Sequence, residues 1–157
     1  MDKSGDKLIE LWITMLIGEY KHILDSKKRL AVPVKFRRFF NKGAVITRGI
    51  DNCLVLYSLK EWETMADKLG KLPASQVEAR SFARVMLAGA MAVKFDRLGR
   101  ILIPDYLKKY AFLNKRAVII GLYNRLEIWS EEKWDIYRER AEKNVDDLAG
   151  KLGELGL

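Results

Sequence analysis

The chain has 157 residues, 49% of them apolar and 32% charged, a composition typical of a globular protein and unlike that of a disordered or fibrous chain. A single cysteine, Cys53, excludes an intrachain disulfide framework, and no apolar run approaches the length of a membrane span. The net charge of +8 is compatible with a polyanionic partner.

The chain repeats one pattern of residues. The segment Asp25–Pro33 (DSKKRLAVP) returns 71 residues later as Asp96–Pro104 (DRLGRILIP). The segment Leu54–Ser58 (LVLYS) returns 72 residues later as Leu126–Ser130 (LEIWS), and each copy is followed by a tryptophan. Two landmarks in the same order at nearly the same spacing rarely arise by chance. We therefore interpret the chain as a tandem duplication of one structural unit, with a pseudo-two-fold axis between the copies.

The duplication divides the chain into five predicted segments. They are an N-terminal extension at 1–14, a first repeat at 18–72, a bridging helix at 73–89, a second repeat at 90–145, and a flexible tail at 146–157. The extension precedes the repeated unit, so we interpret Met15 as the natural start. The alternative for the extension is a helix that packs on the fold through Leu8, Leu11 and Trp12. The tail is charged and rich in glycine, so we expect it to fray.

Each repeat is expected to begin with two strands joined as a hairpin by the Asp-x-x-x-Arg turn, because apolar residues flank a charged break. These strands are predicted at 19–24 and 29–32, and at 90–95 and 100–103. Pro33 and Pro104 then end the strand and open a short helix, at 34–40 and 106–111. Two further strands follow in each repeat, at 44–47 and 53–57, and at 117–121 and 126–129.

Serine residues mark the starts of the longer helices. Ser58 and Glu61 form a capping-box pattern that predicts a helix to about residue 70, and Ser130 stands at the equivalent position of the second repeat. A second capping-box pattern, Ser75 with Glu78, predicts that the bridging helix runs to about residue 88.

Basic residues concentrate at the same place in both repeats. Residues 21–42 contain eight Lys or Arg and one acid, and residues 94–116 contain seven and two, whereas residues 127–154 contain nine acids and five bases. Phosphates attract such basic patches through Coulomb steering and counterion release. A polyanion-binding surface and an ordinary solvated face both explain this charge.

We expect no enzymatic activity. His22, Asp25 and Ser26 are neighbours on one strand and turn, where their side chains point in different directions, and a catalytic triad needs convergent groups. A small enzyme that uses Asp25 or Asp96 in acid-base work is the other possibility, but the sequence offers neither residue a convergent partner. His22 is the only histidine, and the glycines form no phosphate-binding loop, so no metal and no cofactor are predicted.

The Asp-x-x-x-Arg turn is the strongest candidate site. Its Asp can accept backbone donors and pair with the Arg that closes the turn, so a purely structural clamp is one interpretation. Contact with nucleic acid is the other, because rigidly held guanidinium groups suit phosphates and guanine edges. The predicted DNA-binding residues are Asp25, Lys27, Lys28, Arg29, Asp96, Arg97 and Arg100. The predicted secondary basic surface consists of Arg37, Arg38, Arg80, Arg84, Lys108 and Lys109.

These residues resemble the MraZ proteins of bacteria, which are relatives of the AbrB and SpoVT regulators. The resemblance rests on Gly18-Glu-Tyr, on the paired Asp-x-x-x-Arg motifs that lead into a strand and a proline, and on the Leu-x-apolar-apolar-Ser segments followed by Trp. It covers about residues 15 to 145 and implies an α+β, β-rich fold. That fold is a swapped-hairpin AbrB-like β-barrel formed by two tandem pseudo-symmetric repeats, with surrounding helices.

One residue departs from the family pattern. Lys28 stands where glycine is usual, as Gly99 does in the second motif. If the backbone there needs a positive φ, Lys28 is strained or the first turn differs from the second.

The resemblance also implies a function. It implies a sequence-specific DNA-binding regulator, cytoplasmic and associated with the nucleoid, that represses its own division and cell-wall gene cluster. The implied partners are double-stranded DNA with promoter repeats and further copies of the chain in a closed ring, with no membrane. We expect Arg80 and Arg84 to face acids of the next subunit in that ring. The alternative is an oligomeric, architectural, nucleoid-associated protein that binds DNA with little sequence preference, since it would share the basic patch.

Overall fold

The computed structural model describes residues 4–5 and 15–156, so the extension predicted at 1–14 lies almost entirely outside the described residues. The first repeat contains β1 (Leu16–Ile23), β2 (Arg29–Ala31), the 3-10 helix η1 (Val34–Phe40), β3 (Ala44–Arg48), β4 (Leu54–Ser58) and α2 (Leu59–Gly70). The second contains β5 (Met91–Val93), β6 (Arg100–Leu102), α4 (Asp105–Tyr110), β7 (Arg116–Tyr123), β8 (Leu126–Ser130) and α5 (Glu131–Lys143). Between and after the repeats lie α3 (Val77–Ala88), α6 (Val145–Lys151) and the 3-10 helix η2 (Gly153–Leu155).

The two repeats exchange strands. One sheet has the order β1-β7-β8-β4-β3-β5, and a second sheet pairs β2 with β6. When each strand is replaced by its counterpart in the other repeat, the six-strand order becomes its own reverse. The same strand order in both repeats is what the predicted duplication requires, and it places a pseudo-two-fold axis between β4 and β8.

The register agrees with this axis. Leu54 faces Ile128 and Leu56 faces Leu126 across the β4–β8 pair, and each of these pairings maps onto the other when the repeats are interchanged. In the second sheet Leu30 faces Ile101, its own counterpart, so this pair lies on the axis.

The predicted hairpins are wrong in their pairing. The strands on either side of each Asp-x-x-x-Arg turn do not pair with each other, because β1 pairs with β7 and β5 with β3, while β2 and β6 pair together. The turn itself forms, and the Asp25 backbone N–H donates to the Arg29 carbonyl at 3.1 Å. Alternation of apolar and charged residues marks a strand but does not say which strand it pairs with.

The described strands form two separate sheets, and none of their pairings joins the sheets into one barrel. The fold is therefore α+β and rich in sheet, as expected, while the closed swapped-hairpin barrel implied by the resemblance is not confirmed. Among the described residues no helix is long and apolar enough to cross a membrane.

The main core lies between the six-stranded sheet and the β2–β6 pair, and both repeats contribute to it. Leu30 and Ile101 are fully buried on the axis, and Phe36 from η1 and Leu107 from α4 close the core from equivalent positions. A smaller cluster lies under α5, where the Trp129 and Trp134 rings are 5.3 Å apart. Because the main core is shared, neither repeat has a complete core of its own.

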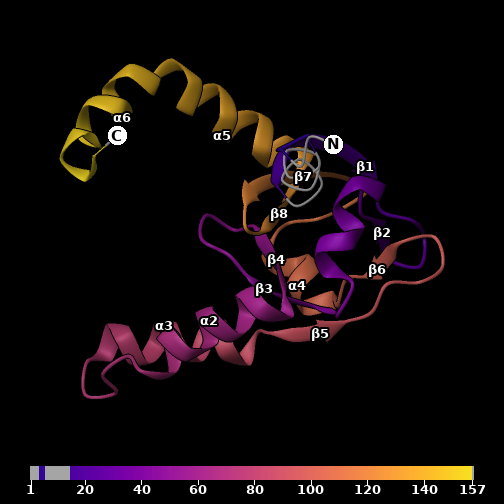
Figure 1. Cartoon of the computed structure of the whole chain (residues 1–157), viewed down its shortest axis with the longest axis horizontal. Helices are drawn as coiled ribbons and strands as arrows, with labels where there is room; N and C mark the ends of the chain where they lie inside the picture. Colours follow the sequence, from indigo (N-terminus) through magenta and orange to yellow (C-terminus); the bar gives the residue numbers. More distant parts are fainter. Residues whose placement is uncertain (1–3, 6–14, 157) are drawn as a thin grey trace.

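The helices form two arms (Figure 1). In that view α2 and α3 project to the lower left and α5 with α6 to the upper left, while the turns before β2 and β6 lie on the right. Ser58 and Ser130 cap α2 and α5 by accepting from the backbone N–H groups of Glu61 and Lys133. Thr47, buried in β3, donates its hydroxyl to the Met86 carbonyl at 2.7 Å and so ties α3 to the sheet.

One helix prediction needs correction, and the predicted flexible tail contains short helices. Ser75 does not cap the bridging helix, which begins at Val77 after Gln76 and has no side-chain cap. The segment 146–157, expected to fray, carries most of α6 and all of η2, neither of which buries a residue. Acids at the start of α6 and Lys151 in its last turn favour this short helix despite its glycine.

We predict that Leu30→Ala lowers the free energy of unfolding by about 2 to 5 kcal/mol, because it leaves a cavity on the axis that both repeats line. Leu102→Ala is the matched control, since Leu102 lies on the adjacent strand and is 58% exposed. Its expected effect is below about 0.5 kcal/mol. Urea denaturation followed by circular dichroism measures both, and equal effects would contradict the shared core.

Candidate nucleic-acid interface

The first turn is closed by the Asp25 carboxylate. Its Oδ1 accepts the backbone N–H groups of Lys27 and Arg29, each at 2.9 Å, and its Oδ2 accepts the Arg29 Nε–H at 2.9 Å. One side chain therefore satisfies two backbone donors and fixes one guanidinium, which is a charge-assisted arrangement.

The second turn has the same geometry. The Asp96 carboxylate accepts the backbone N–H groups of Leu98 and Arg100, each at 2.9 Å, and the Arg100 Nε–H at 2.7 Å. The backbone hydrogen bond from the closing Arg is the largest cause that lowers the pKa of Asp25 and of Asp96, and the arginine side chain adds to it. Both carboxylates are therefore ionised at neutral pH.

The strand exchange brings the two turns together. The Arg100 Nη1 lies 3.6 Å from the Asp25 Oδ2, so a guanidinium of one repeat reaches the carboxylate of the other. The Ile103 N–H donates to the Lys28 carbonyl at 2.9 Å, and the Val32 N–H donates to the Gly99 carbonyl at 3.0 Å. Each turn is thus bonded to the strand that leaves the other turn.

The departure at Lys28 has the predicted consequence. Its φ is +63°, close to the +72° of Gly99, so both turns need a left-handed residue at this position. A left-handed lysine costs roughly 1 to 2 kcal/mol. In this backbone conformation the Lys28 carbonyl accepts the hydrogen bond from the Ile103 N–H, which helps to offset the cost.

The basic residues near the turns come from η1 and α4 as well as from the turns. Lys27 and Arg97 are exposed at the turns, and Arg38 on η1 and Lys109 on α4 are also exposed. Arg37 and Lys108 are half-buried at equivalent positions of the two short helices. The guanidinium of Arg37 occupies the space that a Cβ on Gly99 would need.

Arg80 and Arg84 do not belong to this surface. Both lie on α3, in the arm at the lower left of Figure 1, while β2 and β6 lie on the right. The Arg80 Nη1 donates to the Ala74 carbonyl at 2.8 Å within its own arm. The predicted secondary basic surface is therefore divided, with Arg37, Arg38, Lys108 and Lys109 on the elements that follow the turns.

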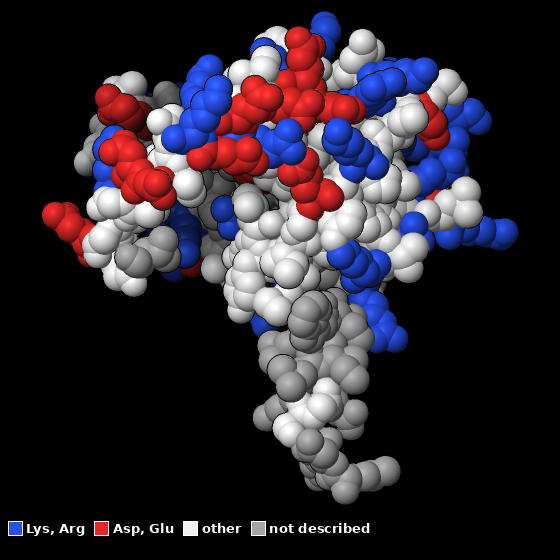
Figure 2. Space-filling model, turned by 90° about the horizontal axis from the view of Figure 1, so that it is seen from above, with Lys and Arg blue, Asp and Glu red and all other residues white. Residues whose placement is uncertain are grey.

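Charge is unevenly distributed over the molecule. Figure 2 shows acidic residues gathered over the middle and left of one face, on the side of α5 and α6, with Lys and Arg projecting at its right-hand edge. That edge corresponds to the right of Figure 1, where the turns lie. Among the described residues no group of three or more His, Cys, Asp or Glu could hold a metal ion.

Sequence reasoning missed one acidic residue of this region. Asp105 opens α4 directly after Pro104, and its carboxylate forms an ion pair with the Lys28 Nζ. An Asp directly before the helix predicted at 106–111 is a helix-start signal in the sequence. The contact of Asp105 with the first turn cannot be predicted from the sequence, because this contact depends on the strand exchange.

The family model described as "MraZ protein, putative antitoxin-like" matches residues 15–85 and again residues 86–151. The chain belongs to the MraZ family. The Transcriptional regulator MraZ of Caldicellulosiruptor saccharolyticus is 49% identical over 145 residues, which cover 91% of this chain and 100% of the relative. The proteins of the same name from Natranaerobius thermophilus and Clostridium tetani are each 45% identical over 143 residues, with the same two coverages. Membership in the MraZ family identifies a transcription regulator and not an enzyme.

We predict that the MraZ-type turns lose their aspartate stabilisation in acid. An aspartate has an ordinary pKa of 3.8, and the folded values of Asp25 and Asp96 are lower, so the unfolded chain binds protons first as pH falls. The stabilisation is complete above about pH 4 and disappears as pH falls through the folded pKa.

Urea denaturation of the native chain and of the Asp25→Asn/Asp96→Asn variant, from about pH 7 to about pH 3, measures this. The difference in unfolding free energy between the two proteins should shrink below about pH 4. A difference in unfolding free energy that stays constant over the whole pH range would show that the ionised Asp25 and Asp96 carboxylates do not cause it.

Proposed function

We propose that the chain is a sequence-specific double-stranded-DNA-binding transcriptional regulator that contacts DNA through its two clamped turns. The observation that carries the proposal is the pair of guanidinium groups, Arg29 and Arg100, each fixed by an aspartate at the same end of the molecule. Side chains held in place before binding lose little conformational entropy when they bind, which favours recognition over simple attraction.

The geometry of each clamp leaves the arginine able to bind. In each turn the aspartate of the same turn engages Nε, and the side chains are 31% exposed for Arg29 and 26% exposed for Arg100. The Nη1 of Arg100 also lies 3.6 Å from the Asp25 Oδ2, so this arginine offers DNA its Nη2, while Arg29 offers both of its Nη groups. The two Nη groups of one arginine suit the O6 and N7 acceptors of guanine in the major groove. The lysines and arginines around the turns supply phosphate contacts, which position the protein without reading sequence.

The resemblance gives the proposal its biological setting. The chain regulates, and represses, its own division and cell-wall gene cluster by binding repeated elements in the promoter, in the cytoplasm and on the nucleoid. The name shared by the curated relatives, Transcriptional regulator MraZ, supports this class of function.

We predict that Arg29→Ala and Arg100→Ala each weaken binding to promoter DNA by about 1 to 3 kcal/mol, since each removes one guanidinium from the interface. Lys68→Ala is a matched control, because it removes an exposed cation from α2, in the other part of the molecule. Fluorescence anisotropy at fixed salt on the promoter and on a scrambled duplex measures both affinity and specificity.

The outcomes separate three interpretations. Loss confined to the promoter identifies base reading. Equal loss on both duplexes identifies phosphate contact and favours the architectural alternative. Unchanged affinity in both arginine variants leaves only the structural clamp.

We further propose that several copies assemble into a closed ring through the helical arms. Both arms expose apolar side chains: Val77, Phe82, Val85 and Leu87 on α3, and Ile136, Tyr137, Val145 and Leu148 on α5 and α6. Exposed apolar patches of this kind are typical of interfaces. Because the two repeats already satisfy each other, a heterologous contact from one arm to the other arm of the next copy can close a ring.

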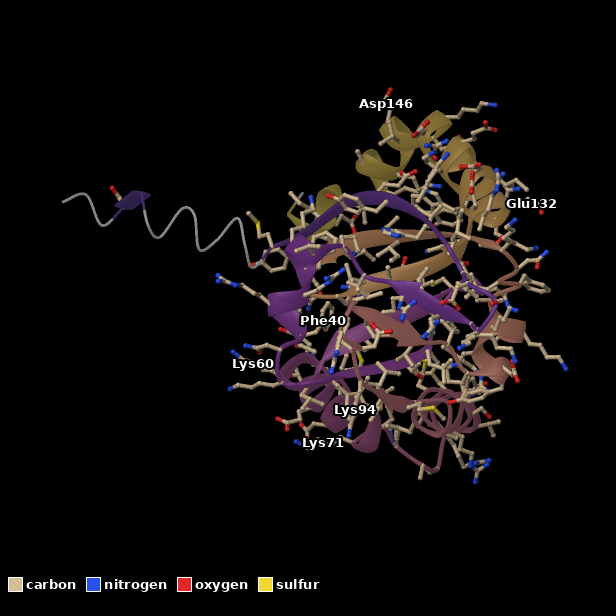
Figure 3. The ribbon with its side chains drawn as sticks, turned by 90° about the vertical axis from the view of Figure 1, so that its right-hand side faces the viewer. Phe40, Lys60, Lys71, Lys94, Glu132 and Asp146 are labelled. Carbon is tan, nitrogen blue, oxygen red and sulfur yellow. The ribbon has the colours of Figure 1, made fainter. Side chains whose placement is uncertain are left out.

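Charge complements these apolar faces. In Figure 3 the acidic residues Glu132 and Asp146 lie at the upper end of the molecule, while Lys60, Lys71 and Lys94 lie toward the lower end. The basic α3 residues Arg80 and Arg84 belong to the lower arm of Figure 1. The acids of α5 and α6 can therefore pair with bases of the lower arm in a head-to-tail contact between copies.

We predict that binding depends steeply on the number of promoter repeats, because a ring presents several turn pairs at high effective concentration. Light scattering should give a mass several times the 18.1 kDa of one chain. Band shifts on one, two and three repeats should show affinity rising with repeat number. A monomer that binds one repeat as tightly as three would contradict the ring.

A further inference from the structure

The two turns are clamped alike, but their surroundings differ. Each turn is bordered by the short helix of the other repeat, η1 beside the second turn and α4 beside the first, as the contacts of Arg37 and Lys28 show. Several pairs of counterpart residues differ in charge or size at these borders, among them Gly99 with Lys28, Arg37 with Lys108, and Val34 with Asp105.

The second turn holds an additional guanidinium. Because Gly99 has no side chain, the Arg37 guanidinium lies directly against it, and the Arg37 Nε donates to the Val32 carbonyl at 3.0 Å. Arg37 lines one hollow together with Asp96, Arg97 and Gly99. Two arginines, Arg37 and Arg97, therefore line the hollow at the second turn, and Arg100 is held by Asp96 in the same turn.

The first turn has an acid in the corresponding region. The Asp105 carboxylate pairs with the Lys28 Nζ, and this hydrogen bond is the largest cause that lowers the pKa of Asp105. Lys108 and Lys109 lower it further, so Asp105 stays charged among three lysines. The counterpart of Asp105 in the first repeat, Val34, carries no charge and is 72% exposed.

We propose that the two turns are unequal DNA contacts, with Arg37 a third DNA-contacting cation of the second turn and Asp105 a residue that weakens the first. This inference rests on the proposed function, because it assigns roles within the same interface. Asp105 acts in two ways: it holds Lys28 away from a phosphate, and its own charge repels one. The two halves of the nearly symmetric chain therefore bind DNA with different strength, and an asymmetric DNA element can bind them in one preferred orientation.

The size of the effect follows from counterion release. Each phosphate that a cation neutralises adds about 0.9 to the salt slope of the binding constant on double-stranded DNA. Freeing Lys28 should therefore steepen the slope by about 1, and removing Arg37 should reduce it by about 1.

The experiment exchanges the counterpart residues in the full chain. Asp105→Val places the first-repeat residue in the second repeat, and Val34→Asp does the reverse. We expect both positions to tolerate the change, since the Asp105 side chain is 72% exposed and Val34 as a whole residue is 72% exposed. Asp105→Asn removes the charge while keeping the shape, and thermal unfolding checks that each variant is folded.

The binding constant for a promoter duplex is measured by fluorescence anisotropy over a range of salt. We expect Asp105→Val and Asp105→Asn to bind several-fold more tightly with a steeper slope, and Val34→Asp to bind several-fold more weakly with a shallower one. Arg37→Ala should lose more affinity than its counterpart variant Lys108→Ala.

Equal losses in Arg37→Ala and Lys108→Ala, or unchanged binding in both Asp105 variants, would overturn the inequality while leaving the proposed function intact. Failure of the native chain to bind DNA in a salt-dependent way would overturn both.

Discussion

Two aspartate carboxylates, Asp25 and Asp96, determine how the rest of the chain can be arranged. In an ordinary hairpin the backbone donors near a turn are satisfied by the ladder between its two strands. Here each carboxylate accepts two of these donors within the turn, at 2.9 Å. The strands on either side are therefore free to pair elsewhere without leaving buried donors unsatisfied.

That freedom produces the exchange of strands, and the exchange produces the interface. Because β2 pairs with β6 across the axis, the turns that precede them lie close enough for Arg100 to reach Asp25. Each basic surface is consequently composite, with a turn from one repeat and a short helix from the other. Duplication within one chain then allows the halves to diverge, as Asp105 and Val34 have done, which a symmetric dimer of identical chains cannot do.

Much of this organisation can be predicted from local patterns. The repeated motif indicates the duplication, and the prolines at 33 and 104 mark the starts of the short helices. Ser58 and Ser130 mark the starts of α2 and α5. The clamp itself is predictable because a carboxylate four residues before an arginine in a turn has few other partners. These are all interactions within a few residues of sequence.

The rest depends on contacts between distant segments. Strand alternation predicts β1 and β2 but cannot assign them to different sheets. The contact of Arg37 with Gly99 and the Lys28–Asp105 ion pair exist only because each short helix borders the other repeat's turn. The positive φ of Lys28 was foreseeable only through the family pattern, in which glycine is usual at that position.

The central claim, that the clamped turns are the DNA-binding surface, is tested most directly by hydrogen exchange of the full chain with and without promoter DNA. Backbone amides of residues 25–31 and 96–102 should become protected on binding, while the backbone amides of α2 and α3 should exchange at the same rate with and without DNA. Protection confined to the helical arms, with the turns exchanging as in the free chain, would contradict it.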